Sequence, residues 1–144
     1  MVSTTMQQVT LPRKLVNQVL AHAQSCPQQE VCGLLSAKNG APARVYKIPN
    51  AATDPAVLFD MHAPALIQAF KEIRERGERL FAIYHSHPGS APRPSAADQA
   101  QLAYPQALYL IVSLDEQGVL QLNGFRCTDE TTSTLEQVEL VITE

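Results

Sequence analysis

Residues 84–98 read Tyr-His-Ser-His-Pro-Gly-Ser-Ala-Pro-Arg-Pro-Ser-Ala-Ala-Asp, and this stretch decides how the rest of the chain is interpreted. It follows the apolar run Leu80–Ile83, which is typical of a buried strand. His85 and His87 stand two positions apart at the end of that strand, so both imidazoles point to the same face of a sheet. The pattern predicts two histidines presented together where a strand gives way to a loop, a common place for binding sites.

A third metal ligand and a proton shuttle can be assigned from the surrounding residues. Asp98, eleven residues beyond His87, could fold back over the strand end as a carboxylate ligand. Two histidines and one carboxylate leave one position of a tetrahedral zinc ion open for water, which is the layout of a catalytic site. Zinc lowers the pKa of such a water to about 7. Glu30, just before the apolar run Val31–Ala37, is the candidate acid/base, and Ser95 could donate to the oxyanion of a tetrahedral intermediate.

Each of these residues has a simpler interpretation when it is taken alone. His85 and His87 could be surface histidines, and Glu30 could be an ordinary surface carboxylate. Ser95 and Asp98 suit the start of a helix, where serine caps the backbone and aspartate faces the positive end of the dipole. The joint pattern His-x-His-Pro-x6-Ser-x-x-Asp fixes five positions, however, and is rare by chance. Capping and metal binding are also compatible, because a cap fixes the helix that aims the ligand.

These motifs resemble the signature of one known family. Residues 30–35, Glu-Val-Cys-Gly-Leu-Leu, together with the histidine motif, resemble the JAMM (MPN+, Mov34/MPN/PAD-1) zinc metalloproteases. Residues 93–98, Arg-Pro-Ser-Ala-Ala-Asp, are similar to those of its small stand-alone bacterial members. The resemblance implies an α/β fold of the cytidine-deaminase-like type, with a mixed β-sheet and helices packed on both sides. It also implies that residues 1–144 form a single JAMM/MPN domain.

The resemblance assigns a role to each residue of the motif. It implies that His85, His87 and Asp98 ligate one Zn²⁺ per chain. It implies that Glu30 is the acid/base that holds the catalytic water, and that Ser95 assists the oxyanion. The sequence carries all of these residue types at the matching positions.

The family also implies a class of substrate. JAMM enzymes hydrolyse amide bonds, and small bacterial relatives are linked to sulfur-carrier proteins of the ThiS/MoaD type. We therefore expect a metalloprotease, or isopeptidase, that cuts an amide bond after the C-terminal Gly-Gly of a ubiquitin-like sulfur carrier. The segments Asn50–Met61 and Gly89–Pro94 are the expected walls of a groove for that tail. Phe59 could contact the substrate there, although core packing is the alternative.

Three alternative functions remain to be weighed. A non-catalytic MPN scaffold usually lacks metal ligands, and all of them are present here. A zinc nucleobase deaminase uses His-x-Glu and Pro-Cys-x-x-Cys, and neither motif occurs in this chain. The same zinc site could also act on short peptides rather than on a carrier protein. Cleavage of a substrate peptide would separate an enzyme from a scaffold, which binds without cutting.

Periodicity predicts a mixture of strands and helices without a strict βαβ rhythm. A helix is expected to open at Pro12, and others are expected over Ala63–Arg76 and Ser95–Leu102. The expected strands are Gln7–Leu11, Val31–Ala37, Ala43–Ile48, Val57–Met61, Arg79–His87, Leu108–Leu114, Val119–Arg126 and Glu136–Ile142. Lys38-Asn39-Gly40 and Glu116-Gln117-Gly118 are typical of turns, and Gly77 of a helix end.

Composition excludes several classes of protein. The 144 residues are 45% hydrophobic and 17% charged, which argues against disorder. Eleven basic and 14 acidic residues give a net charge of −3, so nucleic acid is not an expected partner; the apolar runs are far shorter than the roughly 20 residues of a membrane span, so a membrane is not expected either. No export signal is evident, so we expect a cytoplasmic protein whose odd cysteine count, Cys26, Cys32 and Cys127, predicts no disulfide framework. Edge strands could pair two copies into a homodimer.

Overall fold

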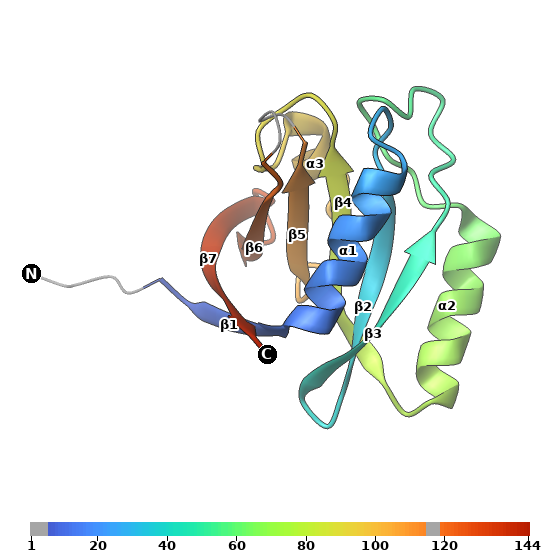
Figure 1. The fold of residues 1–144 in the computed structure, drawn as a ribbon, viewed down its shortest axis with the longest axis vertical. Helices are drawn as coiled ribbons and strands as arrows, with labels where there is room; N and C mark the ends of the chain where they lie inside the picture. Colours follow the sequence, from blue (N-terminus) through green and yellow to red (C-terminus); the bar gives the residue numbers. More distant parts are fainter. Residues whose placement is uncertain (1–5, 115–118) are drawn as a thin grey trace, which may run out of the picture.

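The computed structural model describes residues 6–114 and 119–144, which form a curled seven-stranded sheet with helices on both faces (Figure 1). The strand order across the sheet is β1-β7-β6-β5-β4-β2-β3. The strands are β1 (Gln8–Pro12), β2 (Cys32–Lys38), β3 (Ala41–Ile48), β4 (Arg79–His87), β5 (Leu108–Ser113), β6 (Gln121–Asp129) and β7 (Thr134–Thr143). The helices are α1 (Arg13–Ser25), α2 (Ala63–Glu75) and α3 (Ala96–Ala100).

The sheet is mixed, as the sequence predicts. Strand β4 pairs antiparallel with β2 and parallel with β5, and β1 pairs parallel with β7. The other neighbouring pairs, β2 with β3, β5 with β6 and β6 with β7, are antiparallel. Parallel neighbours need a crossover rather than a hairpin, and the chain between β4 and β5 supplies one that carries α3. This crossover leaves the sheet at the end of β4, where the two histidines lie.

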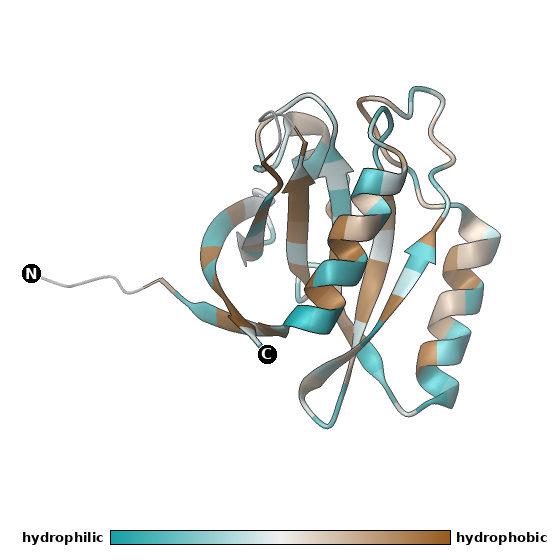
Figure 2. Cartoon of the chain, viewed as in Figure 1, coloured by the Kyte–Doolittle hydropathy of each residue, from teal (hydrophilic) through white to brown (hydrophobic). Residues whose placement is uncertain are grey.

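The two long helices cover opposite faces of the sheet. Val16 and Val19 of α1 belong to one buried core, with side chains such as Leu35 of β2. Ile73 of α2 belongs to a second core on the other face, which includes Leu34. Because successive side chains of a strand point to opposite faces, β2 contributes to both cores and carries a continuous apolar run. Figure 2 shows apolar and polar residues alternating along α1, and its buried residues Leu15, Val16, Val19 and Ala23 have the spacing of an amphipathic helix.

Local backbone conformations bear out two of the predicted chain reversals. Asn39 and Gly40 both have positive φ, 54° and 82°, which is the geometry of a tight hairpin turn between β2 and β3. Gly77, with φ of 69°, follows the end of α2 and carries the chain toward β4. The predicted turn at 116–118 lies outside the described residues.

Three sequence-based boundaries need correction. Val57–Met61 is not a strand, because its only ladder contact is an isolated bridge between Asn50 and Met61. Pro12 ends β1 and precedes α1, which begins at Arg13. The helix predicted over Ser95–Leu102 is shorter, since α3 comprises only Ala96–Ala100.

The cysteines are free, and Cys32 is buried while Cys26 and Cys127 are partly exposed. Among the described residues, no helix has both the length and the apolar character that a membrane span requires.

Candidate metal centre

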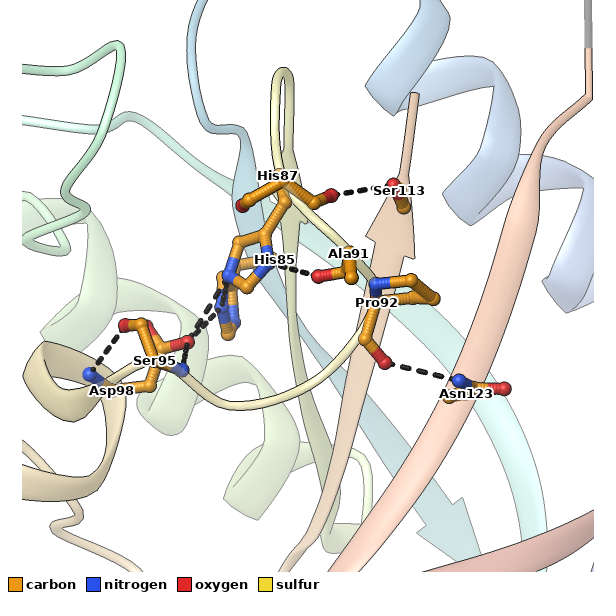
Figure 3. Close-up of polar contacts among 9 residues, drawn as sticks. His85, His87, Ala91, Pro92, Ser95, Asp98, Ser113 and Asn123 are labelled. Atoms are coloured by element: carbon orange, nitrogen blue, oxygen red, sulfur yellow. Dashed lines mark hydrogen bonds and ion pairs between the residues drawn. The ribbon is translucent and has the colours of Figure 1, made fainter. Parts of the chain in front are cut away.

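Four side chains with metal-binding groups converge where β4 ends. The ligand atoms of Glu30, His85, His87 and Asp98 all lie within 4.8 Å of one another. His85 and His87 come from the end of β4, and Asp98 comes from α3, at the far side of the following loop (Figure 3). Glu30 precedes β2, which is paired beside β4 through Cys32 and His85. The structure thus brings together the four residues for which the sequence predicts metal or acid/base chemistry.

Three of these atoms form a triangle of the size that a zinc ion requires. His85 Nε2 and His87 Nε2 lie 3.1 Å apart, and each lies 3.1 Å from Asp98 Oδ2. Ligands bonded to one tetrahedral zinc ion at about 2.0–2.1 Å are about 3.3 Å from one another. Two imidazole nitrogens and a carboxylate oxygen also suit zinc chemically. The donor set and its spacing therefore fit a divalent metal ion.

A hydrogen bond to the Ala91 carbonyl determines which ring nitrogen of His87 faces the metal-binding group. His87 Nδ1 lies 2.8 Å from the Ala91 carbonyl oxygen, which can only accept, so Nδ1 carries a proton. In the neutral imidazole this leaves the Nε2 lone pair pointing toward His85 and Asp98. A cation held among these atoms would replace repulsion between lone pairs with attraction. Supporting a ligand histidine through its second nitrogen is a common feature of metal sites.

Asp98 is held as an anion. The half-buried carboxylate loses solvation, but its contacts with the His85 and His87 imidazoles and with the Ser95 backbone N–H together outweigh that loss and hold its pKa far below the usual range. The same Oδ2 atom accepts from the Ser95 backbone N–H at 2.9 Å. Burial is the largest influence on His85 and, with the nearby His87, lowers its pKa against the opposing effect of Asp98, which favours the neutral form that binds metals. For His87, the contacts with Asp98 and with the Ala91 carbonyl, together with the charge of Glu30, outweigh burial and raise the pKa.

Glu30 has the environment of an acid/base group. It is 5% exposed, and its Oε1 atom has no hydrogen-bond partner among the described residues. Burial raises its pKa to about 7, with His87 opposing and Asp98 reinforcing the shift. A carboxyl group with such a pKa can both accept and release a proton near neutrality.

Ser86, between the two histidines, has a structural role that the sequence does not predict. Its buried hydroxyl accepts from the Val31 backbone N–H at 2.9 Å, and its own N–H donates to the Val31 carbonyl at 3.0 Å. These bonds fasten the segment after Glu30 to β4. No local sequence signal marks this role, because Val31 and Ser86 are 55 positions apart.

Ser95 is exposed and caps α3. Its Oγ accepts from the Asp98 backbone N–H at 3.0 Å, which leaves the hydroxyl proton free to donate elsewhere. Ser95 lines a cavity of about 510 Å³ together with Glu30 and His87. Ser95 therefore caps α3 and also lies next to the metal-binding group.

Phe59 packs directly against His85. Its ring stacks on the imidazole, with centroids 4.4 Å apart and planes inclined by 21°. It also lines a mostly apolar cavity of about 650 Å³, with Ile83, Tyr104 and Tyr109 among the other walls. The loop 51–60 thus forms one wall of this cavity. The loop at Gly89 and Ser90 borders the smaller cavity instead.

Sequence comparisons identify relatives of the chain. It is 30% identical over 117 residues to the desampylase of Haloferax volcanii, covering 77% of this chain and 84% of that protein. It is 28% identical over 117 residues to the CysO-cysteine peptidase of Mycobacterium tuberculosis, with 80% of each chain covered. A probable TtuB-protein conjugate cleaving protease of Thermus thermophilus is 31% identical over 101 residues, covering 69% of this chain and 68% of that protein.

Solved structures agree with this fold. A protein from Desulfitobacterium hafniense, known from its solution structure, matches with a TM-score of 0.80 and 31% identity, covering 94% of this chain and 92% of that chain. A JAB1/MPN domain protein from Archaeoglobus fulgidus matches with a TM-score of 0.54 and 18% identity, covering 96% and 100%. The family model for prokaryotic homologs of the JAB domain matches residues 12–127. The resemblance to JAMM/MPN proteins is thereby confirmed, and the chain belongs to the prokaryotic JAB family.

Proposed function

We propose that this protein is a zinc-dependent peptidase that hydrolyses the amide bond after the C-terminal Gly-Gly of a ubiquitin-like sulfur-carrier protein. The observation that carries the proposal is the convergence of two histidines, an aspartate and a buried glutamate within 4.8 Å. The names of the relatives support the substrate class, since they refer to a CysO-cysteine peptidase, a desampylase and a TtuB-conjugate protease. We infer that residues 1–144 act as one JAB-type domain.

His85, His87 and Asp98 would hold the zinc ion, which supplies a Lewis acid that makes water nucleophilic at neutral pH. Glu30 takes the proton of the attacking water on its unpaired Oε1 atom and delivers it to the departing amine. Ser95 donates a hydrogen bond from its hydroxyl group to the carbonyl oxygen of the scissile bond as negative charge develops there. His87 keeps its orientation through the bond to Ala91.

Phe59 is the proposed substrate contact. It lines the larger apolar cavity and stacks on His85, whereas Glu30 and His87 line the smaller cavity. A Gly-Gly tail can approach backbone and metal closely because it has no side chains to exclude. Tail residues before the glycines would then contact the apolar wall next to Phe59.

The test uses a sulfur-carrier protein extended by one residue after its Gly-Gly terminus. Mass spectrometry should show release of that residue by the zinc-loaded wild type, no release after chelation, and recovery when zinc is returned. Glu30→Gln should bind zinc normally but cut at least about 100-fold more slowly, because only the proton shuttle is removed. Binding of the carrier without any cleavage would support a scaffold instead, and cleavage of unrelated short peptides at equal rate would refute carrier specificity.

A further inference from the structure

The side chain of Asn50, two residues after the end of β3, fills its whole hydrogen-bonding capacity with backbone groups of the loop 51–60 and of Glu30. Its Nδ2 group donates to the carbonyl oxygens of Glu30 and Leu58, each at 2.9 Å. Its Oδ1 atom accepts from the backbone N–H groups of Ala52 and Asp60, each at 3.0 Å. A side-chain amide offers two donors and two acceptors, so all four positions are filled.

These bonds organise the loop 51–60, which has no regular secondary structure to hold it. Backbone bonds close the base of the loop, from Ala51 N–H to the Asp60 carbonyl at 2.7 Å and from His62 N–H to the Pro49 carbonyl at 2.9 Å. The Asn50 amide occupies the interior and bonds to the loop near both of its ends. An aspartate there would place a second oxygen against two carbonyl oxygens.

Pro55 of this loop and Asn50 together hold both backbone polar groups of Glu30. The Glu30 N–H donates to the Pro55 carbonyl at 2.7 Å, and its own carbonyl accepts from Asn50. Glu30 lies outside the regular ladder, because β2 begins at Cys32. Its position relative to the histidines therefore depends on the loop as well as on the bonds between Val31 and Ser86. Phe59, from the same loop, stacks on His85.

We propose that Asn50 is a positioning residue that sets the carboxylate of Glu30 and the ring of Phe59 against the metal-binding group. Asn50 touches neither a metal ligand nor a reacting atom in this arrangement, and acts only through its loop and the Glu30 carbonyl. The expected loss of catalysis rests on the proposed function. The effect of Asn50 on the position of Glu30 is independent of that function, and it can be measured without any substrate.

Two substitutions separate the effects of the two donated and the two accepted hydrogen bonds of Asn50. Asn50→Asp retains the acceptors for Ala52 and Asp60 but removes both donors, and Asn50→Ala removes all four bonds. We expect each variant to lower kcat by about tenfold to 100-fold, the range that misplacement of a catalytic group by about 1 Å produces. Zinc affinity should stay within about threefold of the wild type, because no ligand is altered.

Amide hydrogen exchange provides the readout that is independent of activity. The Glu30 amide should exchange at least about tenfold faster in both variants. The Ala52 and Asp60 amides should lose protection in Asn50→Ala and keep it in Asn50→Asp. Val19→Ala is the matched control for general destabilisation, since Val19 is 1% exposed in the core on the face opposite to His85. It should lower the melting temperature without changing kcat or the exchange of Glu30.

The outcomes separate this proposal from the proposed function. Wild-type kcat and wild-type exchange at Glu30 in Asn50→Asp would overturn the positioning role. A loss of zinc affinity that parallels the loss of kcat would overturn it too, because the effect would then act through the ligands. If the wild type hydrolyses no amide bond, the proposed function fails, and the exchange rate at Glu30 alone decides whether Asn50 holds it.

Discussion

A single oxygen of Asp98 takes part in two structures. Asp98 Oδ2 accepts from the Ser95 N–H in the helix cap and lies 3.1 Å from the Nε2 atoms of His85 and His87. The start of α3 is therefore built onto the metal-binding group. A five-residue helix has little stability of its own, so the cap and the ion would support each other.

Removal of this carboxylate should separate metal binding from proton transfer. We expect Asp98→Ala to weaken zinc binding by about 100-fold or more, whereas Glu30→Gln leaves it close to that of the wild type. Competition with a chromophoric chelator measures both affinities. Ser95→Ala is the control, because it removes the Oγ acceptor of the cap and keeps the ligand. Equal zinc affinity in Asp98→Ala and the wild type would contradict ligation by this residue.

The sequence predicts the residues with metal-binding groups better than the residues that position them. His85, His87 and Asp98 lie within 14 consecutive residues and have the spacing of a metal motif. Asn50 and Ser86 resemble ordinary loop and strand residues. Their partners lie 20 and 55 positions away, so their roles depend on how the chain has folded.

Strand β2 passes close to an aromatic ring at Gly33. A Cβ atom at this position would lie 2.5 Å from the Tyr46 carbonyl oxygen and 2.5 Å from the Tyr84 ring. The carbonyl belongs to the paired strand β3, and Tyr84 is fully buried, so neither can easily move. Gly33 is therefore required by the close packing between neighbouring strands rather than by its φ angle.

Gly33→Ala should be destabilising by about 1–3 kcal/mol because of this overpacking. For a chain of this size the melting temperature should fall by about 3–10 °C. Gly89→Ala is the matched control, because an added Cβ there meets no atom within 4 Å. Thermal unfolding followed by circular dichroism measures both variants. A Gly33→Ala protein as stable as the control would show that the ring and the strand readily give way.

The corner between α2 and β4 is tied to β3 through Glu78. Its carboxylate accepts from the Tyr46 hydroxyl at 2.7 Å and from Arg44 Nε at 3.5 Å. Burial of the carboxyl group would raise its pKa, but these hydrogen bonds prevail and lower it. The anion is thus favoured more in the folded chain than in the unfolded chain.

The lowered pKa of Glu78 makes this contribution dependent on pH. The stabilisation is present above the unfolded-state pKa of about 4.3 and is lost as the pH falls through the lower folded-state pKa. Glu78→Gln should therefore melt below the wild type at pH 7, and the difference should shrink toward pH 3. Paired melting curves across this range measure it. A difference independent of pH would assign the effect to packing rather than to charge.

Most elements could be predicted because their apolar spacing matches one regular period. Val57–Met61 was wrong for a physical reason: apolar side chains two positions apart also suit a loop that lines a cavity. Phe59 faces His85, and Val57 is 61% exposed. The backbone of this loop bonds to the Asn50 side chain, an option that periodicity cannot reveal.

For the molecule as a whole, metal binding should raise stability, because the ligands come from β4 and from the segment beyond the following loop. Zinc at 100 times its dissociation constant should add about 2.7 kcal/mol to the free energy of unfolding. The melting temperature should then rise by about 5–10 °C. Differential scanning calorimetry with and without zinc tests this, with His87→Ala as the control that should show a much smaller rise. An equal rise in the control would place the stabilising ion elsewhere.

The parallel pairing of β1 with β7 has a consequence for the order in which the protein assembles. Gln8 lies opposite Glu139, 131 positions later in the chain. During synthesis, β1 emerges first but has no partner until nearly all of the following chain has been made. The helix α1, which follows β1 at once, must pack onto a sheet that is itself still incomplete. Pairing at this distance is slow, because the entropy of closing so long a loop is lost before any contact compensates for it. Until the two strands pair, the edge of β1, and of β7 once it has been made, is open to strands of other chains, so the incomplete sheet is prone to aggregation.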